Sequence, residues 1–398
     1  MMYFLPHFPL HHNPIALFGL TLLLGLIGGE LARRSRVLPS ISGYIAVGFL
    51  VGPGAFDMVT PSLLTNARIF VDVSLGLILF DLGRHLDFVW MRHDRGLFLT
   101  SLAESGLTFI FIFAVLWIFQ LPLLPAALAA TIAVATAPAV VMMVAHDLSS
   151  EGPVTRRTLI LTSLNNFFAI TLFTLLLPAT RADASHLEMI LHAAYRLLGS
   201  VLVGMLIFLM TKMIASLIGK RKENQFVLFV GAVVFAIGLA SILNLSSMLM
   251  LFTLGVAARN FDKKRTLTEV DFGWLARLFF ILLFVITGIH LQLKGLWFAT
   301  WAVFAFLFAR TFAKIAGVWL FASTSRLTRQ QAWAIGFALM PMAGLAIGMS
   351  NILLDFNPNL GNQLMAIITG AVALLNIIGP IATQLAFIKT DEAIPNKV

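Results

Sequence analysis

The chain has 398 residues, of which 59% are hydrophobic and 11% are charged, whereas a soluble domain carries about 25% charged residues. A soluble fold needs a charged exterior, so this composition excludes a soluble enzyme, a disordered protein and a nucleic-acid-binding domain. The net charge is +9 and there is no cysteine, which fits basic membrane loops and excludes disulfides and thiolate metal sites. We therefore expect an all-α polytopic membrane protein without a metal, a cofactor or a nucleic-acid partner.

Thirteen apolar segments follow one another along the chain, and most are long enough to cross a bilayer as helices. They occupy residues 15–32, 38–52, 67–87, 97–119, 122–145, 157–179, 188–217, 226–244, 246–258, 273–291, 295–322, 331–354 and 362–388. The first segment lacks the basic start of a signal peptide, so we interpret it as a retained helix. We expect one transmembrane domain over 1–390, a short cytoplasmic tail over 391–398, and no soluble regulatory domain.

Basic residues are concentrated in the loops that follow odd-numbered segments, such as Arg33, Arg34 and Arg36 after the first. The opposite loops contain only Arg68, Arg181 and Lys294. Because cytoplasmic loops collect Lys and Arg, this pattern predicts an external N-terminus and a cytoplasmic C-terminus. The short loops fit a bacterial inner membrane.

Two segments are interrupted near their middle. The fifth contains Thr136 and Pro138, and the twelfth contains Pro341 and Gly344. Proline removes a backbone donor and breaks a helix, and a single proline is often only a kink. Two such breaks in corresponding positions of the two halves indicate an inverted-repeat transporter whose site lies where they cross.

Polar groups inside apolar spans are functional candidates because they are costly in lipid. Ser163, Asn165 and Asn166 lie in the sixth segment, and Arg310 lies in the eleventh with Lys314 one turn later. The alternative role of the amides is hydrogen bonding between helices. We expect Lys314 to be able to snorkel to the surface, whereas Arg310 needs buried acceptors.

Carboxylates are scattered over the third and fourth segments. Asp81 precedes Arg84 by three residues, so a local ion pair is its simpler role. Glu104 lies roughly 10 Å inside its helix at a rise of about 1.5 Å per residue. Asp72 lies nearer the outer end.

Three short motifs suggest a family. Gly48 and Gly52-Pro53 end the second segment, Leu278-Phe279-Phe280 precedes Gly288, and Ile378-Gly379-Pro380 lies in the last segment. In this order they resemble the membrane domain of monovalent cation:proton antiporters of the second superfamily, which is sodium/hydrogen exchanger-like and includes the glutathione-gated potassium efflux systems. The resemblance implies inverted five-helix repeats with two broken crossing helices, alternating access and a homodimer.

The resemblance also implies site residues. Thr136 and Pro138 match the family's broken helix, and Arg310 matches its basic core residue. Asn165 and Asn166 match a pair whose second member is the ion-binding aspartate in the family. An amide cannot titrate, so Asn166 cannot exchange a proton for a cation. We therefore expect Asp81 or Glu104, paired with Arg310 or Arg84, to supply the missing carboxylate.

These patterns favour a secondary transporter that exchanges sodium or potassium for protons in the lipid bilayer. An alternative is a carrier of another solute, for example an anionic one, because a net positive crossing that helix N-termini face suits an anion. A second alternative is a membrane sensor that has kept the fold without exchange. We do not expect an enzyme, since the spans offer no pairing of a nucleophile with a base.

Overall fold

The structure is a computed structural model that describes residues 14–35, 38–52, 55–56, 61–93, 95–180, 185–262, 267, 273–289, 296–325, 327–342 and 344–393. All regular elements in these ranges are helical, including one short 3-10 turn, η1 (Leu177–Thr180). The α-helices are α1 (Pro14–Arg34), α2 (Ser40–Val51), α3 (Pro61–Arg84), α4 (Phe88–His93), α5 (Arg95–Ile118), α6 (Leu123–Val134), α7 (Pro138–Asp147), α8 (Pro153–Leu176), α9 (His186–Ile218), α10 (Lys222–Ile242), α11 (Ser247–Phe261), α12 (Gly273–Ile289), α13 (Leu296–Leu320), α14 (Arg329–Ala338), α15 (Gly344–Phe356) and α16 (Pro358–Lys389).

Each predicted segment coincides with a helix, and the two interrupted segments each coincide with a pair of short helices. The fifth segment is α6 followed by α7, and the twelfth is α14 followed by α15. The predicted all-α architecture with two broken helices is therefore confirmed.

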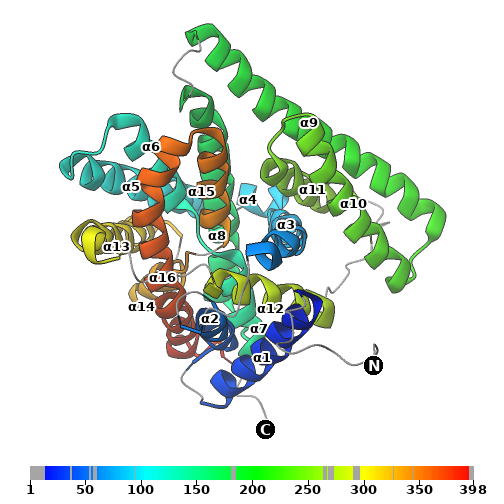
Figure 1. The fold of residues 1–398 in the computed structure, drawn as a ribbon, viewed down its shortest axis with the longest axis horizontal. Coiled ribbons are helices and arrows are strands. Elements are labelled where there is room, and N and C mark those ends of the chain that lie inside the picture. The colour runs from blue at the N-terminus through cyan, green and yellow to red at the C-terminus, as the bar shows by residue number, and fades with distance from the viewer. Residues whose placement is uncertain are drawn as a thin grey trace, which may run out of the picture.

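The helices form two groups that meet along one face (Figure 1). The core group contains α5 to α8 and α13 to α16, with α5 packed along α13. The scaffold group contains α1 to α3 and α9 to α12, with α3 packed along α11. In Figure 1 the long helix α9 runs along the outer edge of the scaffold group. Both broken helices belong to the core group.

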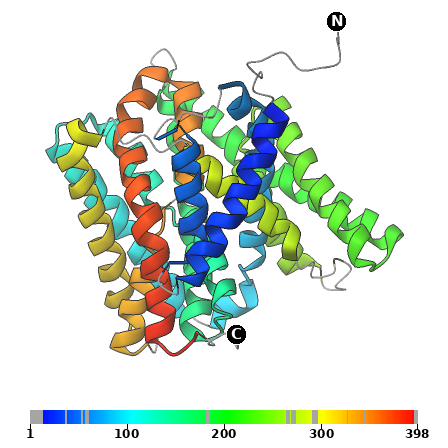
Figure 2. The same ribbon diagram turned by 60° about the horizontal axis from the view of Figure 1, so that its bottom comes forward.

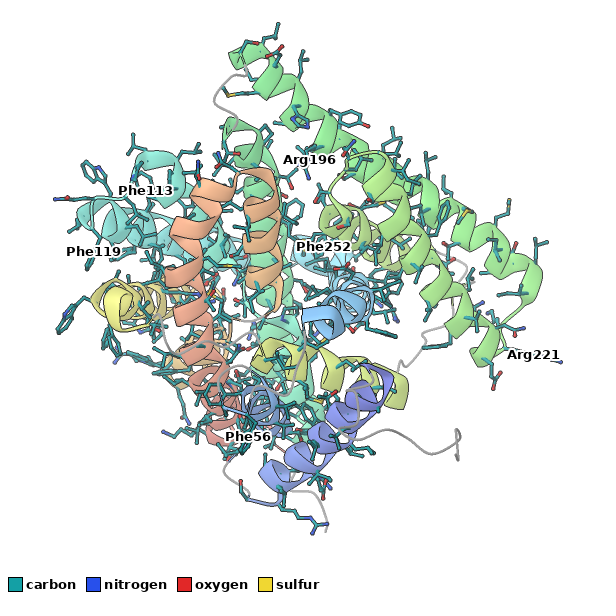
Figure 3. All side chains as sticks on the ribbon, in the orientation of Figure 1. Phe56, Phe113, Phe119, Arg196, Arg221 and Phe252 are labelled. Carbon is teal, nitrogen blue, oxygen red and sulfur yellow. The ribbon has the colours of Figure 1, made fainter. Side chains whose placement is uncertain are left out.

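Apolar side chains cover the rim of the molecule. Leu202 on α9 and Phe308 on α13 are 61% and 75% exposed, and Phe119 lies at the edge beside α5 (Figure 3). Seven helical stretches of the described residues are long and apolar enough to cross a membrane, judged by length and composition. Figure 2 shows α13 and α16 side by side along the height of the bundle. A lipid-facing rim explains why such large side chains are exposed.

The ends of several helices that carry basic residues are joined at one end of the bundle. Arg157 Nη2 donates to Ser325 O at 2.9 Å, and Gln330 Nε2 donates to Lys389 O at 2.7 Å. Arg259 Nη2 bonds to an Asp87 carboxylate oxygen at 2.9 Å. These hydrogen bonds connect the ends of α3, α11, α13 and α16 to one another or to the starts of α8 and α14. Arg36, Arg181, Lys294 and Pro53, which the sequence analysis used, lie outside the described residues.

Glycines let α1 and α2 approach closely. A Cβ on Gly43 would lie 2.1 Å from Gly28 O, and a Cβ on Gly28 would lie 2.9 Å from Gly43 O. Only hydrogen fits at such a contact. Small residues serve this purpose in membranes, where helices associate by close packing.

We predict that Gly43→Leu lowers stability by about 1–3 kcal/mol, because the side chain must push α1 and α2 apart. Thermal unfolding of the purified protein in detergent measures the change. Gly231→Ala is the matched control, because a Cβ at Gly231 meets nothing within 4 Å. Equal melting of the two variants would contradict the packing argument.

Candidate functional site

The two broken helices cross at their interruptions. Ala137 N, just before α7, donates to Pro341 O at 2.9 Å. Thr136 Oγ1 donates to Leu339 O at 3.3 Å. The predicted positions Thr136, Pro138 and Pro341 therefore meet at one point inside the core group.

Proline creates the gap in the first broken helix. Pro138 is the first residue of α7 and has no N–H to give to Val134 O, four residues earlier. The carbonyls at the end of α6 therefore need donors from outside their own helix. In a bilayer those donors must come from protein or a bound ion.

Arg310 of α13 supplies several of these donors. Its Nε donates to Ala133 O and its Nη2 to Ala135 O, both at 2.8 Å. Its Nη1 donates to Met340 O, beyond the end of α14. The side chain is fully buried. One guanidinium thus joins the ends of both broken helices, and it donates to backbone carbonyls rather than to the carboxylate that we expected.

Lys314, one turn later, forms an ion pair with Glu104 of α5. Its Nζ also donates to Val134 O and Thr136 Oγ1, each at 3.2 Å. Both side chains of the pair are fully buried, so Lys314 does not use the route to the surface that the sequence left open to it. A Cβ on Gly317 would lie 2.3 Å from Glu104 Cα, so this glycine lets α13 lie against α5. The carboxylate thereby reaches the crossing.

The two amides of α8, Asn165 and Asn166, also donate hydrogen bonds to Thr136 at the crossing. Asn166 Nδ2 donates to Thr136 O at 2.8 Å and to Thr162 O at 2.9 Å. Asn165 Nδ2 donates to Thr136 Oγ1 at 3.4 Å, and its Oδ1 accepts from Ser105 Oγ at 3.0 Å. Among the described residues, Asn166 Oδ1 has no hydrogen-bond partner and is buried. The two amides therefore make mainly structural hydrogen bonds, and among the described residues one buried acceptor, Asn166 Oδ1, has no partner.

Two predicted site residues lie elsewhere. Asp81 pairs with Arg84 at 3.6 Å, and both side chains are partly exposed at the end of α3. Ser163 Oγ donates to Leu82 O at 3.0 Å, which joins α8 to the scaffold group. Glu104 is therefore the carboxylate that the fold brings to the crossing, and its partner is Lys314 rather than Arg310.

Sequence reasoning missed two parts of the site. Ser101 and Ser105 of α5 both donate to Asn165 Oδ1, at 3.4 and 3.0 Å. Their four-residue spacing around Glu104 was a signal of a polar face on α5. The second missed feature is the choice of partner for Lys314, which depends on the contact between α5 and α13.

We predict that Glu104→Gln and Lys314→Met each lower stability by about 3–5 kcal/mol, because each leaves a buried charge without its partner. The double variant should lose much less than the two single losses added together. Unfolding measured in detergent completes the cycle. Glu30→Gln is the control, since its pair with Arg33 is solvent-exposed and should not change stability measurably. Additive losses at Glu104 and Lys314 would contradict the pairing.

The family model described as "Sodium/hydrogen exchanger, transmembrane" matches residues 19–389. No curated protein matches.

Among solved structures, the chain is similar to the sodium proton antiporter MjNhaP1 from Methanocaldococcus jannaschii. The structure of that protein at pH 8 aligns with a TM-score of 0.69 and 19% identity, covering 94% of this chain and 95% of that chain. A second structure, an electron microscopy map of MjNhaP1, aligns with a TM-score of 0.68 and 16% identity, covering 95% and 94%. At these identities the likeness shows a shared fold. The family match over nearly the whole chain, together with this fold, means that the protein belongs to the sodium/hydrogen exchanger family of membrane transporters.

Proposed function

We propose that the protein exchanges a monovalent cation, sodium or potassium, for protons by alternating access, with Glu104 as the exchange carboxylate. The observation that carries this proposal is the fully buried ion pair between Glu104 and Lys314 beside Thr136, at the crossing of the broken helices. A buried ionisable pair inside a membrane bundle is expensive and is typical of ion or proton pathways.

Lys314 and the transported cation compete for one carboxylate. When Lys314 carries its proton, the ammonium group occupies Glu104. When the proton leaves, Glu104 keeps its negative charge and is open to a cation of the same charge as the one lost. Each cation bound thus corresponds to one proton released, so exchange through this pair is electroneutral.

Oxygen atoms close to Glu104 are suitable additional ligands. Ser105 Oγ lies 3.4 Å from Glu104 Oε2, and Thr136 Oγ1 contacts Lys314 Nζ. Asn166 Oδ1 is a buried acceptor without a protein partner among the described residues. Selectivity among monovalent cations depends on the number and spacing of such oxygens.

Alternating access requires the core group to move against the scaffold group. The crossing faces a small cavity that is lined entirely by apolar residues and glycine from α3, α7, α12 and α15, including Leu79, Pro138 and Leu283. Such a surface has few hydrogen bonds to break when the groups slide. Since Glu104, Lys314 and Arg310 are fully buried, this conformation is closed to both sides, and movement is needed to open it.

We also propose an orientation in the membrane and an oligomeric state. We place the basic end of the bundle, which includes Arg157 and Lys389, in the cytoplasm according to the positive-inside rule. The N-terminus is then external. We also propose a homodimer formed through the scaffold group in a bacterial inner membrane, and one transporter domain over 1–390 with a short tail.

A carrier of an anionic solute is the second candidate. Arg310, Lys314 and Glu104 leave one net positive charge at the crossing, and the apolar cavity lies beside the N-termini of α7 and α15. Helix N-termini favour anions. A sensor without exchange is the third, and Asn166 in place of the family's aspartate is the feature that favours it.

We predict that proteoliposomes holding an internal pH dye will show a pH change when sodium or potassium is added, with lithium as a third probe. Glu104→Gln should abolish the change, since an amide cannot hold a cation against an ammonium group. Asp81→Asn should leave it intact and is the matched control. Activity that survives in Glu104→Gln would refute Glu104 as the exchange carboxylate.

Asn166→Asp separates the remaining candidates. Silence in the wild type with exchange gained in Asn166→Asp would mean that the scaffold is competent but that its natural function is not proton exchange. The anion carrier or the sensor would then replace the proposed antiporter.

A further inference from the structure

Three buried oxygen atoms without protein partners lie in a row on α8. They are Thr158 Oγ1, Thr162 Oγ1 and Asn166 Oδ1, and no described residue hydrogen-bonds to them. All three side chains are 0% exposed. A spacing of four residues puts them on one face of the helix, with a rise of about 6 Å per step. Buried polar atoms of this kind are normally satisfied by water.

The row continues to a carboxylate at the basic end of the molecule. Thr155, one turn before Thr158, places its Oγ1 2.9 Å from Glu392 Oε2 and 2.7 Å from Ser150 Oγ. Glu392 lies just beyond α16 and also accepts from Val154 N and Thr155 N at 2.7 Å each. The carboxylate therefore caps the N-terminus of α8, at 7% exposure.

The other end of the row reaches the ion pair. Asn166 Nδ2 donates to Thr136 O, and Thr136 Oγ1 accepts from Lys314 Nζ at 3.2 Å. Polar groups thus extend from Glu392 at the end of the molecule to Lys314 at the crossing. About 16 Å of helix separates Thr155 from Asn166.

We propose that Thr155, Thr158, Thr162 and Asn166, the α8 stripe, line a hydrated path that carries protons between Lys314 and Glu392. One bridging water with two hydrogen bonds of about 2.8 Å each would match the rise of about 6 Å between stripe residues four apart. This inference rests on the proposed function, in which Lys314 gives up and regains a proton.

The proton balance along the path is simple. Lys314 Nζ gives one proton to the Thr136 hydroxyl or to a water beside it, and each water or threonine O–H passes one proton to the next. Asn166 Oδ1 accepts a hydrogen bond from one of these waters and carries no proton itself, and one proton leaves to solvent beside Glu392. The reverse order recharges Lys314. No oxidant, reductant or other co-reactant takes part.

The stripe is separate from the interface between the core and scaffold groups. Ser163 bonds to Leu82 O of α3, and Thr162 lies about 100° around α8 from Ser163. The stripe therefore offers protons a route inside the core group. The cation, which needs a wider opening, enters between the two groups.

Isosteric removal of the hydroxyls tests the path. Thr158→Val with Thr162→Val keeps side-chain shape, and since these hydroxyls have no protein partner, folding should not suffer. Thr171→Val is the matched control, because Thr171 is on the opposite face of α8 beyond Asn166 and its Oγ1 is also without a partner. Thr162→Ser, which keeps a hydroxyl, is the conservative variant.

The experiment measures two fluxes in proteoliposomes and the melting temperature in detergent. Sodium-driven proton flux in the double valine variant should fall at least about tenfold, equivalent to about 1.4 kcal/mol on the barrier. Exchange of labelled sodium for unlabelled sodium needs no proton and should be unchanged. Thr171→Val and Thr162→Ser should behave like the wild type, and no variant should melt earlier.

Three results would overturn the path. Unchanged proton flux in the double variant would show that protons travel elsewhere while the antiporter itself stands. Equal loss of both fluxes, with earlier melting, would show that the stripe only stabilises α8. Absence of any sodium- or potassium-dependent pH change in the wild type would refute the antiporter and the path together.

Discussion

The structure depends on two buried cations that satisfy the open ends of two broken helices. Breaking α6 from α7 and α14 from α15 leaves carbonyl groups in a region without solvent, where each unsatisfied group costs several kcal/mol. Arg310 donates to three of these carbonyls and Lys314 to a fourth. The planar, permanently charged guanidinium suits this role because it offers several donors in fixed directions. The ammonium group of Lys314 has only one backbone acceptor there, which leaves it available for Glu104.

This division of labour explains how the site tolerates amides at Asn165 and Asn166. Arg310 does not need a carboxylate at either of these positions, because backbone carbonyls at the negative ends of α6 and α14 stabilise its charge. The amides instead brace Thr136 from the side of α8. Among the described residues at the crossing, the buried negative charge is that of Glu104 on α5, which pairs with Lys314 of α13. Under the proposed function the exchange carboxylate lies on α5 instead of α8, and both of these core helices pack against α6 beside the same break.

Much of this arrangement could be predicted from the sequence. The breaks at Pro138 and Pro341 were visible because proline acts locally, and the demand of Arg310 for buried acceptors followed from its depth in an apolar span. The sequence could not show that Glu104 and Lys314 would pair with each other. Glu104 and Lys314 are 210 residues apart, and their contact depends on Gly317 letting α13 lie against α5. The sequence also could not show that Arg310 donates to the carbonyls of Ala133 and Ala135, because every residue has a backbone carbonyl. Proximity between helices is a property of packing rather than of periodicity.

The presence of one carboxylate rather than two has a consequence for coupling. In the proposed exchange, Glu104 is the one negative group that the described residues place at the crossing, so protonated Lys314 and a transported cation exclude each other and each cation bound releases one proton. A carboxylate at Asn166 would add a second group able to hold either a proton or a cation, so that the number of protons released per cation would no longer be set by Lys314 alone. The amide is therefore compatible with tight exchange, although it resembles a loss of function when the α8 pair is considered alone. In the proposed exchange, one-for-one coupling follows from competition for a single negative charge. Among the described residues at the crossing, that charge belongs to Glu104, and Lys314 and the cation compete for it.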